Sequence, residues 1–219
     1  MFYSQNGQDR FLYENFFKDF QDGSFIEIGA LDGIKFSNSL FFENMGWKTV
    51  LCEANPNQKN NLLTNRNKES CLIINKAVVP ETENKEVVEF LSFTENAWGQ
   101  GLSGIYENYD SSHLNRIRSE LQSKKIPVEP SLVNVDTIKI NSLLRKSEKH
   151  LKTNHFDVIT IDVEGAEIEI IKTIEFEKFN FNFIVFEDNY HKDDGFLLSR
   201  GFDFIKTLGS DKIYKRIKK

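Results

Sequence analysis

Residues 25–33 read Phe-Ile-Glu-Ile-Gly-Ala-Leu-Asp-Gly. The apolar start of this stretch predicts a buried strand, and Gly29 and Gly33 predict a sharp turn after that strand. A helical pattern follows from about Asn38. A strand, a glycine turn and a helix in this order predict a site where a ligand can lie against bare backbone. The carboxylate of Glu27 suits a ligand with an amine or free hydroxyls better than one dominated by a pyrophosphate.

The turn does not carry the dinucleotide-binding fingerprint. That fingerprint requires G-x-G-x-x-G, but Leu31 and Ile34 occupy the positions of its second and third glycines. The pattern here is E-x-G-x-x-x-G, which resembles the first motif of the class I S-adenosylmethionine-dependent methyltransferases. An ordinary strand-to-helix turn has the same pattern, so this motif alone leaves both interpretations open.

The bulk composition is that of a soluble globular protein. The 219 residues are 39% hydrophobic and 28% charged, and the length predicts one domain over residues 1–219. The net charge of −5 argues against a general polyanion binder, so we expect no nucleic-acid partner.

Several features predict a cytoplasmic location. Cys52 and Cys71 lie in apolar runs without C-x-x-C spacing, which indicates buried thiols in a reducing compartment. We find no signal-peptide pattern at the start of the sequence. No apolar run approaches the roughly 18 residues that a membrane-spanning helix needs, so we expect no membrane span.

The chain alternates between strand and helix patterns. Because its strands are uninterrupted apolar runs, this alternation predicts an α/β fold with a mostly parallel sheet covered on both faces. An antiparallel hairpin is expected over 202–217, and a Gly- and aromatic-containing insertion over about 94–130 is expected to form a lid. A helix over about 8–20 is expected to cap the sheet edge, and the alternative is that its polar start, residues 4–9, reaches the pocket. The other expected strands are 24–28, 49–52, 71–75, 86–93, 133–137, 156–162 and 181–186, and the other helices cover about 38–44, 56–66, 111–124, 140–145 and the segment after Glu167.

Polar residues follow the strands at what should be one edge of the sheet. In open α/β sheets ligands bind beyond the carboxyl ends of the strands. Glu53 ends the second strand about 20 residues after the glycine turn, where such folds place the acceptor of ribose hydroxyls. The residues expected around this crevice are Glu27, Gly29, Glu53, Asn75, Ala77, Asp162 and Glu187. Together they favour a nucleoside-type cofactor more strongly than any single motif.

These residues resemble the FkbM-type methyltransferases. The resemblance spans most of the chain but does not cover the insertion. It is carried by Gly7-Gln8-Asp9, residues 25–33, Ser37-Asn38-Ser39-Leu40, Gly46-Trp47, Glu53-Ala54-Asn55-Pro56 and residues 161–167, which read Ile-Asp-Val-Glu-Gly-Ala-Glu.

The resemblance implies a Rossmann-like, seven-stranded class I fold and methyl transfer from S-adenosylmethionine, typically to a hydroxyl oxygen. By carry-over, residues around the glycine turn would line the methionine end, Glu53 would hold the ribose, and residues 75–77 would lie near the adenine. The full set of expected cofactor residues is Glu27, Gly29, Ala30, Asp32, Gly33, Asn38, Glu53, Asn55, Asn75, Lys76, Ala77 and Asp162.

The chemistry left to the protein is alignment of the reacting atoms and removal of the acceptor's proton. The candidates for catalysis are Asp162, Glu164, Glu187 and His191. Asp162 ends a buried strand at the crevice, whereas Glu164 also suits a role in capping the next helix and His191 that of a bystander.

A magnesium-assisted transfer is a minority alternative. Asp162 with Asp188-Asn189 resembles the Mg²⁺ arrangement of catechol-type O-methyltransferases. Gly165, however, stands where that family uses Lys. We therefore expect no metal.

The acceptor is expected to be a sugar, a glycan unit or another small metabolite. Trp98, Tyr106, Tyr109 and His113 of the insertion suit stacking on a sugar ring or packing of the lid. Two other functions remain open: a catalytically silent nucleoside-binding module and an NAD-dependent oxidoreductase, the latter disfavoured by the failed fingerprint.

Overall fold

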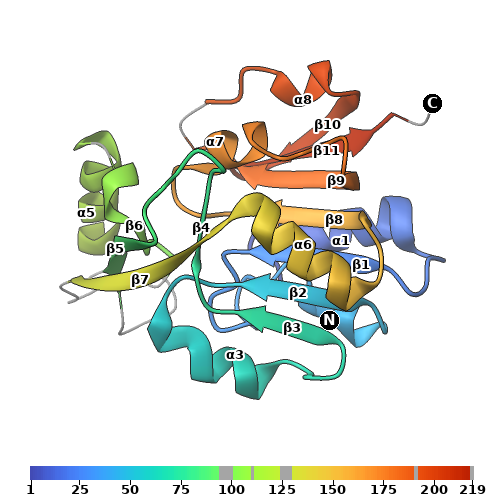
Figure 1. The fold of residues 1–219 in the computed structure, drawn as a ribbon, viewed down its shortest axis with the longest axis horizontal. Helices are drawn as coiled ribbons and strands as arrows, with labels where there is room; N and C mark the ends of the chain where they lie inside the picture. The colour runs from blue at the N-terminus through green and yellow to red at the C-terminus, as the bar shows by residue number, and fades with distance from the viewer. Residues whose placement is uncertain (94–100, 110, 124–129, 190–191, 218–219) are drawn as a thin grey trace.

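The computed structural model describes residues 1–93, 101–109, 111–123, 130–189 and 192–217 (Figure 1). Within these residues, a seven-stranded sheet has the order β10-β11-β9-β8-β1-β2-β3. The run from β9 to β3 is parallel, β11 is antiparallel to β9, and β10 is antiparallel to β11. The strands are β1 (Ser24–Ile28), β2 (Lys48–Cys52), β3 (Cys71–Ile74), β8 (His155–Ile161), β9 (Asn180–Glu187), β10 (Phe202–Leu208) and β11 (Asp211–Arg216). The predicted parallel-rich sheet and closing hairpin are confirmed.

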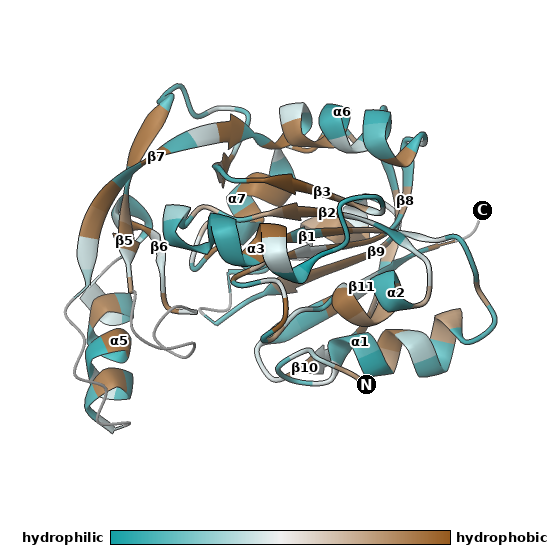
Figure 2. Cartoon of the chain, turned by 90° about the horizontal axis from the view of Figure 1, so that it is seen from below, coloured by the Kyte–Doolittle hydropathy of each residue, from teal (hydrophilic) through white to brown (hydrophobic). Residues whose placement is uncertain are grey.

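The central strand β1 is buried on both faces. Its alternate residues Ile26 and Ile28 pack against α6 (Ile140–Leu151) and α7 (Glu167–Lys172) on one face of the sheet. Phe25 points to the opposite face, which is covered by α1 (Gln8–Leu12) and α2 (Leu40–Asn44). Figure 2 shows the apolar strands enclosed between these two helical layers, whose outer surfaces are polar. A strand buried on both faces has no polar side to display, which explains its uninterrupted apolar sequence.

The N-terminal helix differs from the expectation of an edge cap over 8–20. It consists of α1 and a π-helical turn, Tyr13–Phe17, and it lies on a face of the sheet. Phe17 anchors it there, because its ring meets the ring of the fully buried Trp47 edge-on at 4.9 Å and also contacts Phe183 of β9. Aromatic packing against the sheet face therefore decides where this helix lies.

A second sheet, which the sequence did not predict as a separate unit, has the order β4-β7-β5-β6. Its long strands pair antiparallel, and β4 pairs parallel with the end of β7. The strands are β4 (Ala77–Val79), β5 (Val87–Ser92), β6 (Gly104–Ile105) and β7 (Ser131–Lys139). With α5 (Ser111–Ser123) this sheet stands beyond the carboxyl ends of the parallel strands (Figure 1). The expected strands 86–93 and 133–137 exist, but they belong to this second sheet.

The remaining elements are short. A 3₁₀ turn at Pro56–Gln58 leads into α3 (Lys59–Asn65), and α8 (Phe196–Ser199) precedes the hairpin. Cys52 and Cys71 are free and buried. Nowhere in the described part of the chain is a helix both long and apolar enough to cross a bilayer.

Candidate functional site

A cavity of about 580 Å³ lies between the two sheets, at the carboxyl ends of the parallel strands. This volume is typical of sites that take a small molecule. Gly29, Cys52 and Asp162 line its base at the ends of β1, β2 and β8. The opposite wall is formed by the second sheet and α5, through residues that include Val78, Phe90, Ile105, Arg116 and Glu120.

The strands at the base of the cavity are joined closely at Gly29. Its N–H donates to the carbonyl oxygen of Cys52 at 2.9 Å, and the N–H of Asp162 donates to the carbonyl oxygen of Ile28 at 3.0 Å. Gly29 has a φ of +88°, and a Cβ at this position would overlap the carbonyl oxygen of Asp162. Glycine is therefore required at this position for two reasons: the backbone conformation is left-handed, and the neighbouring backbone at Asp162 leaves no space for a side chain.

Leu31, Phe36 and Glu164 adopt left-handed backbone conformations, with φ between +48° and +61°, and all of them line the cavity. A left-handed non-glycine residue costs roughly 1–2 kcal/mol, and such residues gather at binding and catalytic sites. Leucine and phenylalanine rarely adopt this conformation, so the sequence does not indicate it. Leu31 and Phe36 were therefore not predicted as residues of the site.

Glu53 reaches the cavity from the end of β2. Its carboxylate accepts hydrogen bonds from the backbone N–H groups of Leu31 at 2.8 Å and Asn55 at 2.7 Å. Burial raises the pKa of Glu53 to about 7. Asn75 donates to the carbonyl oxygens of Glu53 and Asn55, so it holds the turn that carries this carboxylate.

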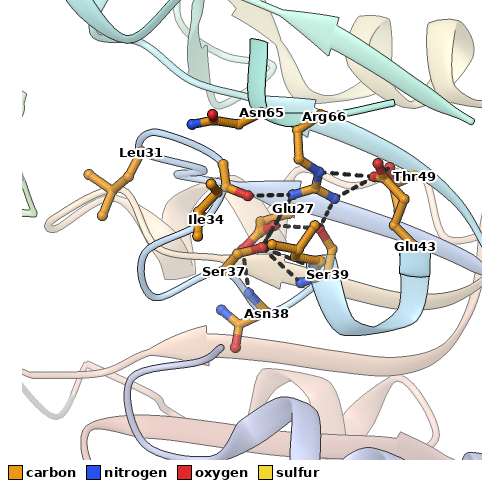
Figure 3. A network of polar contacts seen from close by, with 12 residues as sticks. Glu27, Leu31, Ile34, Ser37, Asn38, Ser39, Glu43, Thr49, Asn65 and Arg66 are labelled. Atoms are coloured by element: carbon orange, nitrogen blue, oxygen red, sulfur yellow. Dashed lines mark hydrogen bonds and ion pairs between the residues drawn. The ribbon is translucent and has the colours of Figure 1, made fainter. Parts of the chain in front are cut away.

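Glu27 occupies a different place from the one expected. It is absent from the cavity lining, and its carboxylate accepts hydrogen bonds from Ser37, Asn38 and Ser39 at 2.5–2.9 Å (Figure 3). The fully buried guanidinium of Arg66 lies 3.8 Å from it. Glu27 therefore holds the loop that precedes α2, and this loop brings Asn38 to the cavity.

The other predicted cofactor residues divide in the same way. Gly29, Asn38, Glu53, Lys76, Ala77 and Asp162 line the cavity, whereas Glu27, Ala30, Asp32, Gly33, Asn55 and Asn75 do not. Members of the second group shape the turns, as Asp32 does by accepting hydrogen bonds from the backbone N–H groups of Ile34 and Lys35.

Acidic side chains meet where β8 and β9 end. Carboxylate oxygens of Asp162, Glu167 and Glu187 lie within 4.8 Å of one another, close enough to hold a metal ion together. Burial raises the pKa of Asp162 and of Glu187 well above the ordinary values, and neighbouring negative charges raise them further. Asp188, expected as the partner of Asp162 in a magnesium site, instead pairs with Lys212 at 2.7 Å.

Neither Glu164 nor Glu167 caps α7, whose N-cap residue Ala166 makes no side-chain hydrogen bond, and Glu167 instead holds the turn that precedes this helix. Its carboxylate accepts hydrogen bonds from the backbone N–H groups of Val163 and Gly165, at 2.9 and 3.0 Å. Glu164 lines the cavity and meets α5: its Oε2 lies 3.1 Å from His113 Nε2 and 2.7 Å from a guanidinium nitrogen of Arg116. Glu187 also lines the cavity.

Of the residues expected to stack on a sugar or to pack the lid, the three that the structure describes, Tyr106, Tyr109 and His113, are not in the cavity lining. His113 and Tyr109 are buried with their ring centroids 4.2 Å apart, and Tyr106 lies outside the lining. Trp98, His191 and parts of the expected lid, residues 94–100, 110 and 124–129, lie outside the described residues. The aromatic side chains in the lining are Phe36 and Phe90.

The buried carboxyls predict how stability varies with pH. Burial raises the pKa of Glu53, Glu164 and Asp211 to about 7, from ordinary values of 4.5 and 3.8. Between these values the folded protein holds protons that the unfolded chain has released, so the free energy of unfolding falls as the pH rises. One pKa unit is about 1.4 kcal/mol, so the two units between pH 5 and pH 7 correspond to a loss of about 3 kcal/mol for each such carboxyl. We therefore expect a total loss of at least about 3 kcal/mol and a melting temperature lower by at least roughly 5–10 °C above pH 7 than near pH 5. Thermal unfolding followed by circular dichroism across this range checks it, and a constant or rising melting temperature would contradict it.

The comparisons with known proteins agree with this geometry. The family model described as the methyltransferase FkbM domain matches residues 27–211, which include every strand of both sheets except the first residues of β1 and all but the first residue of β11. No curated protein matches the chain. Since the model covers most of the sequence, the chain belongs to the FkbM methyltransferase family.

Proposed function

We propose that the protein transfers the methyl group of S-adenosylmethionine to a hydroxyl oxygen of a sugar, a glycan unit or another small metabolite. We further propose that residues 1–219 act as one domain in the cytoplasm. The observation that carries the proposal is the cavity beyond the carboxyl ends of the parallel strands, with Glu53 and Gly29 at its base, in a chain of a methyltransferase family.

The residues of the cavity fit this cofactor by their chemistry. The Glu53 carboxylate suits two ribose hydroxyls, because each of its oxygens can accept a further hydrogen bond. Ala77 and Val78 offer an apolar wall to an adenine, and the negative charge of Asp162 suits an amine or a sulfonium. Gly29 removes the side chain that would otherwise separate a ligand from the backbone.

The cofactor supplies a methyl carbon attached to a positively charged sulfur, which is an excellent leaving group. The chain's own residues then need to orient the acceptor oxygen, exclude water and accept the acceptor's proton. The wall formed by residues 101–105 and α5 faces the base of the cavity, and we propose that the insertion over about 94–130 selects the acceptor as a lid.

A divalent cation is the alternative source of hydroxyl activation. Asp162, Glu167 and Glu187 would supply its oxygen ligands, and the cation would lower the pKa of an acceptor hydroxyl. Activity that is lost in EDTA and restored by Mg²⁺ would support this alternative, whereas full activity in the chelator would remove it.

Calorimetric titration with S-adenosylmethionine, S-adenosylhomocysteine and NAD⁺ tests the proposed cofactor. We expect micromolar binding of both adenosyl ligands and none of NAD⁺. Glu53→Ala should weaken adenosyl binding by roughly 150-fold, because hydrogen bonds to a charged group worth about 3 kcal/mol in all are lost. The exposed Glu69→Ala is the matched control and should bind as the wild type does.

The other outcomes identify the rival functions. Binding of NAD⁺ alone would favour an oxidoreductase. Adenosyl binding without methyl transfer to any sugar or small-molecule acceptor would favour a silent nucleoside-binding module. Unchanged affinity in Glu53→Ala would overturn the role given to this carboxylate.

A further inference from the structure

We propose that Glu164 is the base that accepts the proton of the acceptor hydroxyl, and that His113 and Arg116 of α5 are positioning residues that hold its carboxylate. The inference rests on the proposed function and deepens it, since it chooses among the acidic residues of the cavity and assigns a role to the inserted helix. It rests on contacts between Glu164, which follows β8, and α5, which lies about 50 residues earlier in the sequence.

The contacts hold one carboxylate oxygen from two directions. Glu164 Oε2 lies 2.7 Å from the Arg116 guanidinium and 3.1 Å from His113 Nε2. His113 and Arg116 stand one helical turn apart, so they present a common face of α5. Arg116 also forms an ion pair with Glu120 at 3.2 Å, and both of these side chains line the cavity with Glu164. The base would therefore be built jointly by the main sheet and the insertion.

The backbone around Glu164 is also fixed by its surroundings. Glu164 has a φ of +61°, and Gly165 after it has a φ of +129°. A Cβ on Gly104 of β6 would lie 3.1 Å from the Cβ of Glu164, which shows how closely β6 covers this residue. A strained conformation persists only where its surroundings enforce it, and here those surroundings are β6 and α5.

The other cavity carboxylates are less suited to this role. Asp162 follows β8 directly, and its backbone meets Gly29 beside the proposed cofactor position. Its carboxylate lies within 4.8 Å of the carboxylates of Glu167 and Glu187. Glu187 accepts a hydrogen bond from Ser210 on the hairpin. Among the cavity carboxylates at the ends of the parallel strands, Glu164 is the one that the described contacts connect to β6 and α5. Glu120 also lines the cavity, but it lies on α5 itself.

Charged neighbours tune the ionisation of Glu164 in opposite directions. Burial raises its pKa, Arg116 lowers it, and the negative charges of Glu167 and Glu120 raise it again, which gives a pKa of about 7. The other titratable groups that face it are His113, Asp162 and Glu187.

The proposed step balances without a further reactant. The hydroxyl proton passes to the Glu164 carboxylate, and the acceptor oxygen uses its lone pair to form the bond to the methyl carbon. The electron pair of the broken carbon–sulfur bond stays on sulfur, which becomes a neutral thioether. The proton on Glu164 then leaves to solvent.

Substitution of the base is the first test. Glu164→Gln should lower kcat by about 10²–10⁴-fold, because a positioned general base contributes a factor of this size. The affinity for S-adenosylmethionine, measured by calorimetry, should change less than about threefold, since Glu164 is assigned to the acceptor and the proposed cofactor contacts remain. A Glu164→Gln protein that binds the cofactor and keeps the wild-type kcat would overturn the inference.

Substitution of Arg116 tests the positioning role separately. Arg116→Gln removes a positive charge that favours ionised Glu164, so the acidic limb of the pH profile of kcat should move up by about one pH unit. Arg116→Lys should restore most of that shift, and the exposed Arg118→Gln on the same helix should leave the profile unchanged. An unshifted limb in Arg116→Gln would overturn the inference.

A spectroscopic titration gives a readout that needs no turnover. The infrared band of a protonated carboxyl that is present in the wild type and absent from Glu164→Gln should titrate at higher pH in Arg116→Gln than in the wild type, because Arg116 contacts this carboxylate at 2.7 Å. A Glu164 band that titrates at the same pH in both proteins would contradict the positioning role of Arg116. Failure of the wild type to bind S-adenosylmethionine would instead overturn the proposed function, so the two failures are distinguishable.

Discussion

Gly29→Ala should lower the free energy of unfolding by about 3–5 kcal/mol. The added Cβ would overlap the carbonyl oxygen of Asp162 and lie 3.0 Å from its carbonyl carbon, and both atoms belong to the backbone of the neighbouring strand segment. A flexible side chain could turn away, but this backbone is held by the hydrogen bond from Asp162 N–H to Ile28 at 3.0 Å. The strands β1 and β8 would have to separate at the base of the cavity, so binding of S-adenosylmethionine should be lost as well.

Gly46→Ala is the matched control for this prediction. Gly46 also has a positive φ, +96°, but no atom lies within 4 Å of the position that its Cβ would take. Only the backbone strain applies there, so we expect a loss of roughly 1–2 kcal/mol. Urea unfolding curves of both variants separate the steric effect from the conformational one. Equal losses in the two variants would contradict the clash with Asp162.

Arg66→Met should also destabilise the protein by about 3–5 kcal/mol, because it leaves buried carboxylates without a counter-charge. The Arg66 guanidinium is fully buried, lies 2.6 Å from Glu43 and 3.8 Å from Glu27, and also donates to Ser39 at 2.8 Å (Figure 3). Its pairing lowers the pKa of Glu43, whereas burial raises the pKa of Glu27 despite the nearby charge. Methionine can fill the space of the aliphatic stem but not replace the charge.

Chemical denaturation at neutral pH measures this loss. Arg145→Met on the exposed side of α6 is the control and should change stability by less than about 0.5 kcal/mol. Adding Glu43→Gln to Arg66→Met should recover part of the stability, because one uncompensated charge is then removed. A loss below about 1 kcal/mol in Arg66→Met would mean that water or rearrangement compensates these carboxylates.

Sequence reasoning predicted the elements whose patterns are local. The apolar runs at β1, β8 and β9 are long and bounded by polar residues, so their burial in a parallel sheet followed from the alternation of strands and helices. The same rule placed Glu53 and Asp162 at the carboxyl edge, and both line the cavity. These predictions succeed because one local pattern, an apolar run that ends in polar residues, determines both the burial of a strand and the position of its carboxyl end.

The missed features depend on partners that are distant in the chain. Glu27 looks like a ligand-binding carboxylate beside the glycine turn, and only the position of Arg66 in the fold reveals its structural role. Similarly, β5 and β7 alternate as they would in any half-buried sheet, so their pattern does not show which sheet they join. The contact of His113 with Glu164 spans 51 residues, and no local periodicity encodes it.

The pairing of β4 with β7 has an evolutionary consequence. Because Val79 of β4 lies opposite Lys139 of β7, the segment between these two residues, which includes β5, β6 and α5, begins and ends at neighbouring points. A segment with adjacent ends can be lengthened, shortened or replaced by recombination while the parallel strands keep their register. We therefore expect the FkbM methyltransferases to diverge most between these two strands, so that new substrates are acquired by exchanging this segment over an inherited parallel sheet.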